Sequence, residues 1–322
     1  MQASSILKPI SEQLQQVDDR LREFSESSEL PSLKDLLIHV FDSSGKLARP
    51  ALTLLTAGFH PNDGEKVITM ATAVEMLHVA TLVHDDTVDE SDTRRGRVTV
   101  SSSWGQHTAV LLGDYVFAAS ATYVCSTGNI RVIKRFSETI MDLSRGQMQE
   151  TANSRDIKNG MDDYLERIYF KTASLFSTSG ESGAILSGAS ESIVQSLKTY
   201  SEKIGLAFQV VDDVLDITGT PQEIGKPVGS DLLNGVITLP TIYAIEDPGC
   251  RKKVGLFLED PSNTELHSEI VDMIKHSDVG ERSYKYADQL VEEAKLSLQS
   301  LEDNDCKRSL LDLADFIISR NN

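Results

Sequence analysis

The sequence has no proline between Pro61 and Pro221. Proline removes a backbone hydrogen bond and clashes with the preceding turn, so helix interiors rarely contain it. A proline-free stretch of this length favours long stacked helices over a strand-rich fold with many turns. The sequence therefore predicts an all-α fold. Because no segment has the composition of a linker, we also expect a single domain over residues 1–322.

Cysteine is also scarce, with only Cys125, Cys250 and Cys306. Three scattered thiols are too few for a disulfide framework or a zinc knuckle, so we expect buried thiols in a reducing compartment. No window offers about 18 uncharged apolar residues, and residues 1–23 carry charges where a signal peptide has an apolar core. These absences predict a cytoplasmic protein with no integral membrane segment.

Basic side chains are few relative to acidic ones. The chain has 31 Lys and Arg against 49 Asp and Glu, a formal net charge of −18. Such a balance argues against a polyanion as the main partner, so we expect no nucleic-acid partner.

Apolar residues recur at helical spacing through most of the chain. They predict helices over residues 6–24, 33–41, 49–57, 67–90, 108–125, 131–150, 161–186, 191–217, 239–244, 284–301 and 307–319. The helix over residues 108–125 is uncharged apart from Asp114, so we predict a central helix packed on all sides. Its Tyr115, Phe117 and Tyr123 are expected in the core.

Two triplets with the pattern Asp-Asp-x-x-Asp occur on apolar predicted helices. Their members are Asp85, Asp86 and Asp89 in the first triplet, and Asp212, Asp213 and Asp216 in the second. On the helix over residues 67–90, Asp85 and Asp89 end an apolar stripe. Carboxylates this close repel one another and resist losing water, so a buried pair needs a cation between its members.

Divalent metal is the cation that these triplets indicate. Carboxylate oxygens are hard ligands that suit Mg²⁺, which often completes its shell with substrate phosphates. The triplets therefore predict opposing walls of a metal-filled cleft and a diphosphate substrate. A calcium-binding EF-hand is disfavoured because it alternates its ligands around a glycine. We interpret the isolated Asp42, Asp114 and Asp162-Asp163 as surface residues or helix caps.

Further motifs accompany the triplets. They comprise Gly45, Lys46, Arg49, Pro50, His78, Arg94, Arg95, Gly96, Lys171, Thr172, Phe208, Gln209, Gly225, Lys226 and Asp231. In this order they resemble the trans-isoprenyl diphosphate synthase family, or polyprenyl synthetases, over nearly the whole chain. The resemblance is to the long-chain type, such as hepta- and octaprenyl diphosphate synthases, and implies a bundle of long helices around a central cavity.

The resemblance implies a Mg²⁺-dependent prenyltransferase. It would condense isopentenyl diphosphate head to tail with geranyl, farnesyl or geranylgeranyl diphosphate, giving an all-trans polyprenyl diphosphate. Three Mg²⁺ would link the allylic diphosphate to both Asp triplets. Isopentenyl diphosphate would be held by Lys46, Arg49, His78 and Arg95. The residues around the allylic diphosphate would be Arg94, Lys171, Thr172, Gln209 and Lys226, with Lys171 also counted as catalytic.

Product length in this family depends on a tunnel that begins just before the first triplet, where an aromatic residue stops growth early. Here Ala80 and Thr81 occupy these positions. Because one helical turn rises about 5.4 Å, small residues there leave room for at least one further extension step. We expect products longer than C20, in the range C30 to C50, and a tunnel floor near Leu77, Val74 or residues 110–117.

Some residues depart from the usual pattern of the family. These are Ser44, Leu47, Ala48 and Val236, the last standing where many members have a lysine. A homodimer is expected, but a catalytic chain with a non-identical partner and a short-chain C15–C20 synthase stay open. A class I terpene cyclase is disfavoured because its second metal site usually has an Asn-Ser-Glu type pattern. Intact triplets disfavour a non-catalytic subunit, and we interpret His84 as a helix-packing residue or a support for the first triplet.

Overall fold

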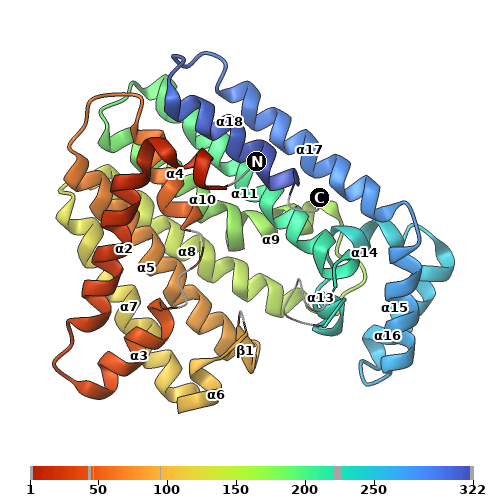
Figure 1. Cartoon of the computed structure of the whole chain (residues 1–322). Coiled ribbons are helices and arrows are strands. Elements are labelled where there is room, and N and C mark those ends of the chain that lie inside the picture. The colour runs from red at the N-terminus through yellow and green to blue at the C-terminus, as the bar shows by residue number, and fades with distance from the viewer. Residues whose placement is uncertain (1–2, 43–44, 46, 95, 221–226, 320–322) are drawn as a thin grey trace. The chain divides into compact units, whose positions relative to one another are not determined.

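The structure is a computed structural model, and it describes residues 3–42, 45, 47–94, 96–220 and 227–319. Helices dominate this part of the chain (Figure 1). Its strands are β1 (Thr93–Arg94) and β2 (Arg97–Val98), which pair antiparallel. The prediction of an all-α fold is confirmed.

The helices have these bounds in chain order: α1 Ala3–Ile6, η1 Lys8–Ile10, α2 Ser11–Glu26, α3 Pro31–Phe41, α4 Ala48–Ala57, α5 Gly64–Val88, α6 Val100–Trp104, α7 Gln106–Ser126, α8 Ile130–Asn153, α9 Met161–Ile168, η2 Tyr169–Ala173, α10 Ser174–Leu186, α11 Glu191–Thr218, α13 Ser230–Leu233, α14 Leu239–Ala244, α15 Pro248–Glu259, α16 Thr264–Lys275, α17 Val279–Ser297 and α18 Asp305–Ile318.

The chain divides into two compact units that alternate along the sequence. Unit 1 comprises Met1–Glu138, Leu175–Ser201 and Ser300–Asp312, and unit 2 comprises Thr139–Ser174, Glu202–Gln299 and Leu313–Asn322. Helices α8, α11 and α18 contribute residues to both, and α10 begins with Ser174 of unit 2 and continues in unit 1. The expectation of a single domain over residues 1–322 stays a prediction.

Helix α5 is the central element of unit 1. Every side chain from Val67 to Leu77 is buried, and the helix packs against α2, α4 and α7. Apart from Glu75, its residues there are apolar or small on all faces, as expected for a helix that is surrounded by others. The core of unit 1 therefore forms around the helix that also carries the first Asp triplet.

The prediction that the helix over residues 108–125 is packed on all sides is wrong for this chain. On α7, Leu111 is 55% exposed and Tyr115 is 42% exposed, while Phe117 and Tyr123 are only half-buried. An uncharged helix can have a second apolar face that the single chain leaves open. Composition alone does not separate this case from complete burial.

Two helices, α5 and α7, are long and apolar enough to cross a membrane by length and composition alone. The apolar window of α5 is 78% buried, as in a core helix, whereas that of α7 is 33% buried. Of the thiols, Cys250 is buried as predicted, but Cys125 is exposed and Cys306 is partly exposed. The prediction of three buried thiols is therefore wrong.

Proline positions explain where the helix boundaries differ from the sequence periodicity. The predicted helix over residues 6–24 is interrupted because Pro9 lies in the short η1, so that α2 begins only at Ser11. Helices α15 and α16 were not predicted. Helix α15 begins with Pro248 after Asp247, whose side chain accepts a hydrogen bond from the Cys250 N–H, a regular helix start.

The core of unit 2 contains residues of α11 and of the helices from α13 to α17. Phe257, Ile270 and Val254 are among its fully buried members, together with Ile237 from the segment that leads into α14. This core fixes the chain that follows α13, which lies next to the end of α11.

Glycines let α10 approach its neighbours in unit 1. A Cβ atom at Gly183 would lie 2.2 Å from the carbonyl oxygen of Thr53 in α4. A Cβ atom at Gly180 would lie 1.9 Å from the Ser201 hydroxyl oxygen in α11. At both positions the neighbouring helix therefore lies so close to the backbone of α10 that it occupies the space a side chain of α10 would need.

We expect Gly183→Ala to lower the free energy of unfolding by about 1–3 kcal/mol, because the added methyl group meets the backbone of α4. Gly64→Ala is the matched control: no atom lies within 4 Å of its Cβ position, and alanine favours the helix. Urea unfolding of both variants measures the difference. Equal midpoints for the two variants would contradict this account of the packing.

Candidate active site

The first Asp triplet lies at the carboxyl end of α5 in unit 1. The helix ends at Val88, and Asp89 is its C-cap, donating its backbone N–H to the Asp85 carbonyl oxygen at 2.8 Å. Asp86 is buried, Asp85 is half-buried and Asp89 is exposed. The prediction that Asp85 and Asp89 end a buried stripe is therefore wrong, because α5 ends at Val88 and its C-cap Asp89 is exposed.

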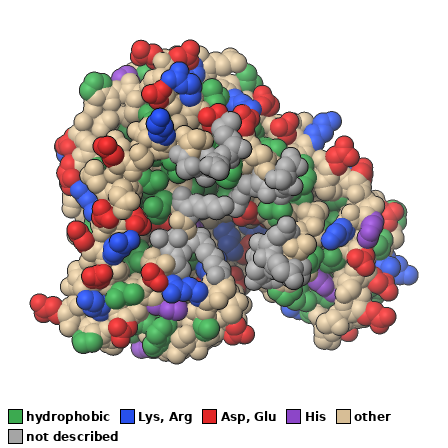
Figure 2. Space-filling model, in the orientation of Figure 1, with side chains coloured by type: hydrophobic (Ala, Val, Ile, Leu, Met, Phe, Trp, Pro, Cys, Tyr) green, Lys and Arg blue, Asp and Glu red, His purple; other side chains and the backbone are tan. Residues whose placement is uncertain are grey.

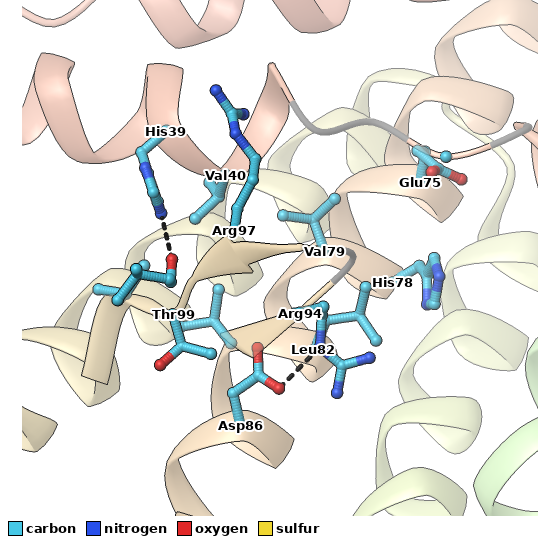
Figure 3. A pocket seen from close by; sticks show the side chains of 14 residues that line it. His39, Val40, Glu75, His78, Val79, Leu82, Asp86, Arg94, Arg97 and Thr99 are labelled. Carbon is cyan, nitrogen blue, oxygen red and sulfur yellow. Dashed lines mark hydrogen bonds and ion pairs between the residues drawn. The ribbon is translucent and has the colours of Figure 1, made fainter. Parts of the chain in front are cut away.

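The β1–β2 hairpin brings Arg94 to Asp86. The Ser91 N–H donates to the Asp86 carbonyl oxygen at 2.9 Å, and Arg94 Nε donates to Asp86 Oδ1 at 2.7 Å (Figure 3). Burial raises the pKa of Asp86 above its usual value. The Arg94 charge and hydrogen bond oppose this rise, and the negative charge of Asp89 adds to it. The arginine thus stabilises a carboxylate at the edge of the apolar core.

A cavity lies beside this ion pair, also in unit 1. Its volume is about 610 Å³ including the solvent at its open side. Helix α5 contributes Glu75 and His78, α3 contributes His39, and the hairpin contributes Arg94 and Arg97 (Figure 3). The cavity wall therefore carries cations, carboxylates and imidazoles, which suits a charged ligand better than an apolar one.

Two of the four residues expected to hold isopentenyl diphosphate are described. His78 lines the cavity. Arg49 lies in the first turn of α4, with its guanidinium carbon 4.6 Å from the ring centre of Phe176. Lys46 and Arg95 lie outside the described residues.

The residues expected to set product length occupy α5 just before the first triplet. Leu77 and Ala80 are completely buried. Thr81 is half-buried and donates its hydroxyl to the His78 carbonyl oxygen at 2.8 Å. Ala80 and Thr81 lie between His78 and Asp85, and Leu77 directly precedes His78, on the helix that lines the cavity.

The second Asp triplet lies on α11 in unit 2. Asp212 is half-buried, whereas Asp213 and Asp216 are buried. Asp213 Oδ2 accepts a hydrogen bond from the Tyr164 hydroxyl at 2.7 Å, and Asp213 Oδ1 accepts one from Gln209 Nε2 at 2.8 Å. Both oxygens of this buried carboxylate therefore have donors.

Burial is the main influence on ionisation at Asp213. It raises the pKa of Asp213 above the usual aspartate range, and the negative charge of Asp231 raises it further. The hydrogen bonds from Gln209 and Tyr164 act in the opposite direction. Burial also raises the pKa of Tyr164 well above its ordinary value, so that its phenol keeps its proton and donates.

Asp216 organises the segment that follows the second triplet. Its Oδ1 accepts from the Ser230 hydroxyl at 2.8 Å and its Oδ2 from the Asp231 N–H at 3.2 Å, so that it holds the start of α13. The Val236 N–H in turn donates to the Asp231 carbonyl oxygen at 2.8 Å. The departure at Val236 is thus connected through this segment to the second triplet.

The segment η2 is a π-helical turn that carries Lys171 and Thr172. Lys171 Nζ forms an ion pair with Glu150 of α8, and the Thr172 hydroxyl donates to Gln209 Oε1 at 2.6 Å. A Cβ atom at Gly146 would lie 2.8 Å from the Lys171 backbone nitrogen, so α8 packs closely on this turn. Single-turn π-helices are frequent at functional sites.

Sequence reasoning did not identify Glu150, Tyr164 or Arg167. Arg167 is buried, donates to the Ile237 carbonyl oxygen at 2.7 Å, and lies 3.7 Å from the Glu150 carboxylate. One sequence signal points to Glu150. It follows Gly146 by four residues on α8, so both residues lie on the same face of this helix, the face that packs closely on η2. Lys226, expected near the allylic diphosphate, lies outside the described residues.

Both triplets offer carboxylate oxygens, the donors that Mg²⁺ prefers. The described part of the chain has no group of three or more His, Cys, Asp or Glu side chains that could hold a metal ion without other ligands. Mg²⁺ is often bound through one or two carboxylates together with water and substrate phosphates. That the two triplets face each other and share three Mg²⁺ stays a prediction.

Comparison with known proteins extends over nearly the whole chain. The sequence model described as polyprenyl synthetase matches residues 30–274. Heptaprenyl diphosphate synthase component 2 of Geobacillus stearothermophilus is 35% identical over 320 residues, 99% of each chain. Nonaprenyl diphosphate synthase of Mycobacterium tuberculosis is 33% identical over 322 residues, 99% of this chain and 94% of that protein.

Solved structures give the same result. The crystal structure of heptaprenyl diphosphate synthase from Staphylococcus aureus matches with a TM-score of 0.93 and 35% identity, over 97% of this chain and 99% of that one. The resemblance predicted from the motifs is therefore confirmed, and the chain belongs to the polyprenyl synthetase family of trans-prenyltransferases.

Proposed function

We propose that this protein joins isopentenyl diphosphate head to tail to an allylic diphosphate, such as geranyl, farnesyl or geranylgeranyl diphosphate. The product is an all-trans polyprenyl diphosphate longer than C20, in the range C30 to C50. Family membership supports the reaction type, and the names of the relatives support a medium or long product. The observation that carries the site assignment is the Asp86–Arg94 pair beside the charged cavity of unit 1.

The cavity of unit 1 supports binding of isopentenyl diphosphate. His78 is part of its wall, and Arg49 is a cation of the same unit. Guanidinium groups bind phosphate oxygens through two parallel hydrogen bonds, which fix both the position and the orientation of a diphosphate. In our proposal Lys46 and Arg95 complete this set.

The Asp triplets are proposed to hold Mg²⁺ at the allylic diphosphate. When bound, the metal would neutralise the diphosphate and stabilise it as a leaving group. Asp85 and Asp212 are the half-buried members, so their oxygens are the more accessible ones. Buried Asp86, Asp213 and Asp216 have hydrogen-bond donors that keep each triplet in place.

Lys171, Thr172 and Gln209 are proposed to surround the allylic diphosphate. Lys171 is paired with Glu150, which keeps the ammonium group in a defined place before the substrate binds. Its flexible side chain and compact charge suit an exchange of the carboxylate partner for a diphosphate. Arg94 and Lys226 are the further cations proposed for this ligand.

A homodimer is proposed for the assembly. On α7, Val110, Leu111 and Tyr115 are exposed by 42–55%, an apolar face that a second copy would cover. A second candidate is a catalytic chain that needs a non-identical subunit, because the Geobacillus relative is named component 2 and Val236 departs from the family pattern. Three free thiols support the proposed cytoplasmic location.

The purified chain, given isopentenyl and farnesyl diphosphates with Mg²⁺, is expected to form products longer than C20 without any partner. Chromatography of the dephosphorylated products measures their length, and light scattering of the same sample is expected to give the mass of two chains. A chelator should abolish the activity. Cyclic hydrocarbons would support the cyclase instead, and activity only after adding a second subunit would support the heteromer.

We expect Ala80→Phe to shorten the main product by about one five-carbon step or more, because the ring fills one helical turn below Asp85. Chromatography of the products measures the change. Since Ala80 is fully buried, a thermal unfolding curve checks that the variant folds. Thr81→Phe, at a half-buried site, is the companion variant, and unchanged product lengths in both would discard the tunnel assignment.

Asp85→Asn is expected to lower kcat by about 10²-fold or more and to raise the Mg²⁺ concentration for half-maximal activity, because a neutral amide is a poor ligand for a hard cation. Asp162→Asn, on the exposed first turn of α9, is the matched control and should leave both quantities unchanged. Steady-state kinetics at varied Mg²⁺ tests the pair. Wild-type Mg²⁺ dependence in Asp85→Asn would remove Asp85 from the metal site.

A further inference from the structure

Four side chains of unit 2 form a continuous chain of hydrogen bonds. The Tyr164 hydroxyl of α9 donates to Asp213 Oδ2 at 2.7 Å. The other oxygen of Asp213 accepts from Gln209 Nε2 at 2.8 Å, and Gln209 Oε1 accepts from the Thr172 hydroxyl at 2.6 Å. The chain thereby connects α9, α11 and the π-helical turn η2.

This chain determines which way the Gln209 amide points. Its NH₂ group faces a carboxylate oxygen, and its carbonyl oxygen faces a hydroxyl donor. The reversed amide would place an oxygen against the Asp213 carboxylate, where both atoms are acceptors. The single hydroxyl proton of Thr172 is directed at Gln209. This hydroxyl can therefore form further hydrogen bonds only as an acceptor, through its lone pairs.

Tyr164 is the inner end of the chain. It is 1% exposed, so it has no access to a ligand in solution. Its hydroxyl occupies the Asp213 oxygen that Gln209 does not use. Without this donor the Asp213 carboxylate would lose one of its two fixed directions, and Gln209 could then follow the rotation of that carboxylate.

We infer that Tyr164 is a positioning residue for the condensation, acting through Asp213, Gln209 and Thr172 to hold the η2 turn in place, so that the Lys171 ammonium group on this turn lies at the allylic diphosphate. The inference rests on the proposed function, which places Gln209 and Thr172 around that ligand. Lys171 precedes Thr172 on the same turn, so an error in the turn also displaces the ammonium group. Tyr164 therefore controls the allylic site without touching substrate.

Another tyrosine of the protein provides a matched control, in which the lost hydrogen bond has a purely structural role. Tyr200 is also fully buried, and its hydroxyl donates one hydrogen bond, to the Leu310 carbonyl oxygen at 2.5 Å in unit 1. Tyr200→Phe and Tyr164→Phe thus remove the same group from the same kind of surroundings. The Tyr200 hydroxyl donates to the backbone of α18, whereas the Tyr164 hydroxyl starts the hydrogen bonds that lead to residues proposed around the allylic diphosphate.

Steady-state kinetics on the full-length variants tests the inference. We expect Tyr164→Phe to raise the KM for farnesyl diphosphate by about 5- to 20-fold, because the buried hydrogen bond that fixes Asp213 is lost. The KM for isopentenyl diphosphate should change less than about twofold. Tyr200→Phe should leave both quantities unchanged. Equal kinetics for the two variants would overturn the inference.

A double-mutant cycle shows whether Tyr164 acts through the hydrogen bonds that lead to Thr172 or only on its immediate surroundings. Thr172→Val removes the outer donor, so adding Tyr164→Phe to it should raise the KM for farnesyl diphosphate little further, whereas additive effects would contradict the connection. If Tyr164→Phe does not fold, Asp213→Asn replaces it in the cycle. Because Asn presents an NH₂ group to Gln209, it should raise the same KM by a smaller factor in a Thr172→Val background than in the wild-type chain, and additive effects, as expected from the metal site alone, would overturn the inference. Absence of any product with the unaltered chain would instead contradict the proposed function.

Discussion

Acidic side chains that are withdrawn from water need hydrogen-bond donors, and this requirement shapes both units. An unpaired buried charge costs several kcal/mol, on the order of the whole stability of a domain. In unit 1 the hairpin after α5 supplies Arg94 to Asp86. In unit 2, Tyr164 and Gln209 supply Asp213, and the start of α13 supplies Asp216. The hairpin, α9 and the start of α13 thus lie close enough to the triplets to supply hydrogen-bond donors to their buried carboxylates.

This arrangement also prepares each triplet for a cation. In both triplets the buried members have protein donors, while Asp85 and Asp212 remain half-buried. Groups that are held in place before a ligand arrives lose little free energy to reorganisation when it binds. A rigid inner carboxylate next to a more accessible one is therefore a useful arrangement for binding a diphosphate through metal.

The sequence was sufficient for the all-α class, most of the long helices and the family. Periodicity and the two triplets are local signals, which explains this success. The sequence did not predict that Asp86 is buried and Asp89 is exposed, because this difference depends on where α5 ends. Nor did it identify Glu150 or Tyr164, because contacts between distant segments leave no periodic trace. The apolar composition of α7 gave the wrong prediction for the related reason that it cannot say what covers a helix.

The π-helical turn η2 places a limit on how this region can change during evolution. A π-turn holds about one residue more than an α-turn, so deleting a residue within η2 would leave α10 in phase but change where Lys171 and Thr172 lie. A deletion in the regular helix on either side would rotate the side chains beyond it by about 100°, and the glycines of α10 that fit against their neighbours would turn away from them. Insertions and deletions should therefore be rare between α9 and α10 among functional descendants of this chain, whereas substitutions that preserve the chain length remain acceptable.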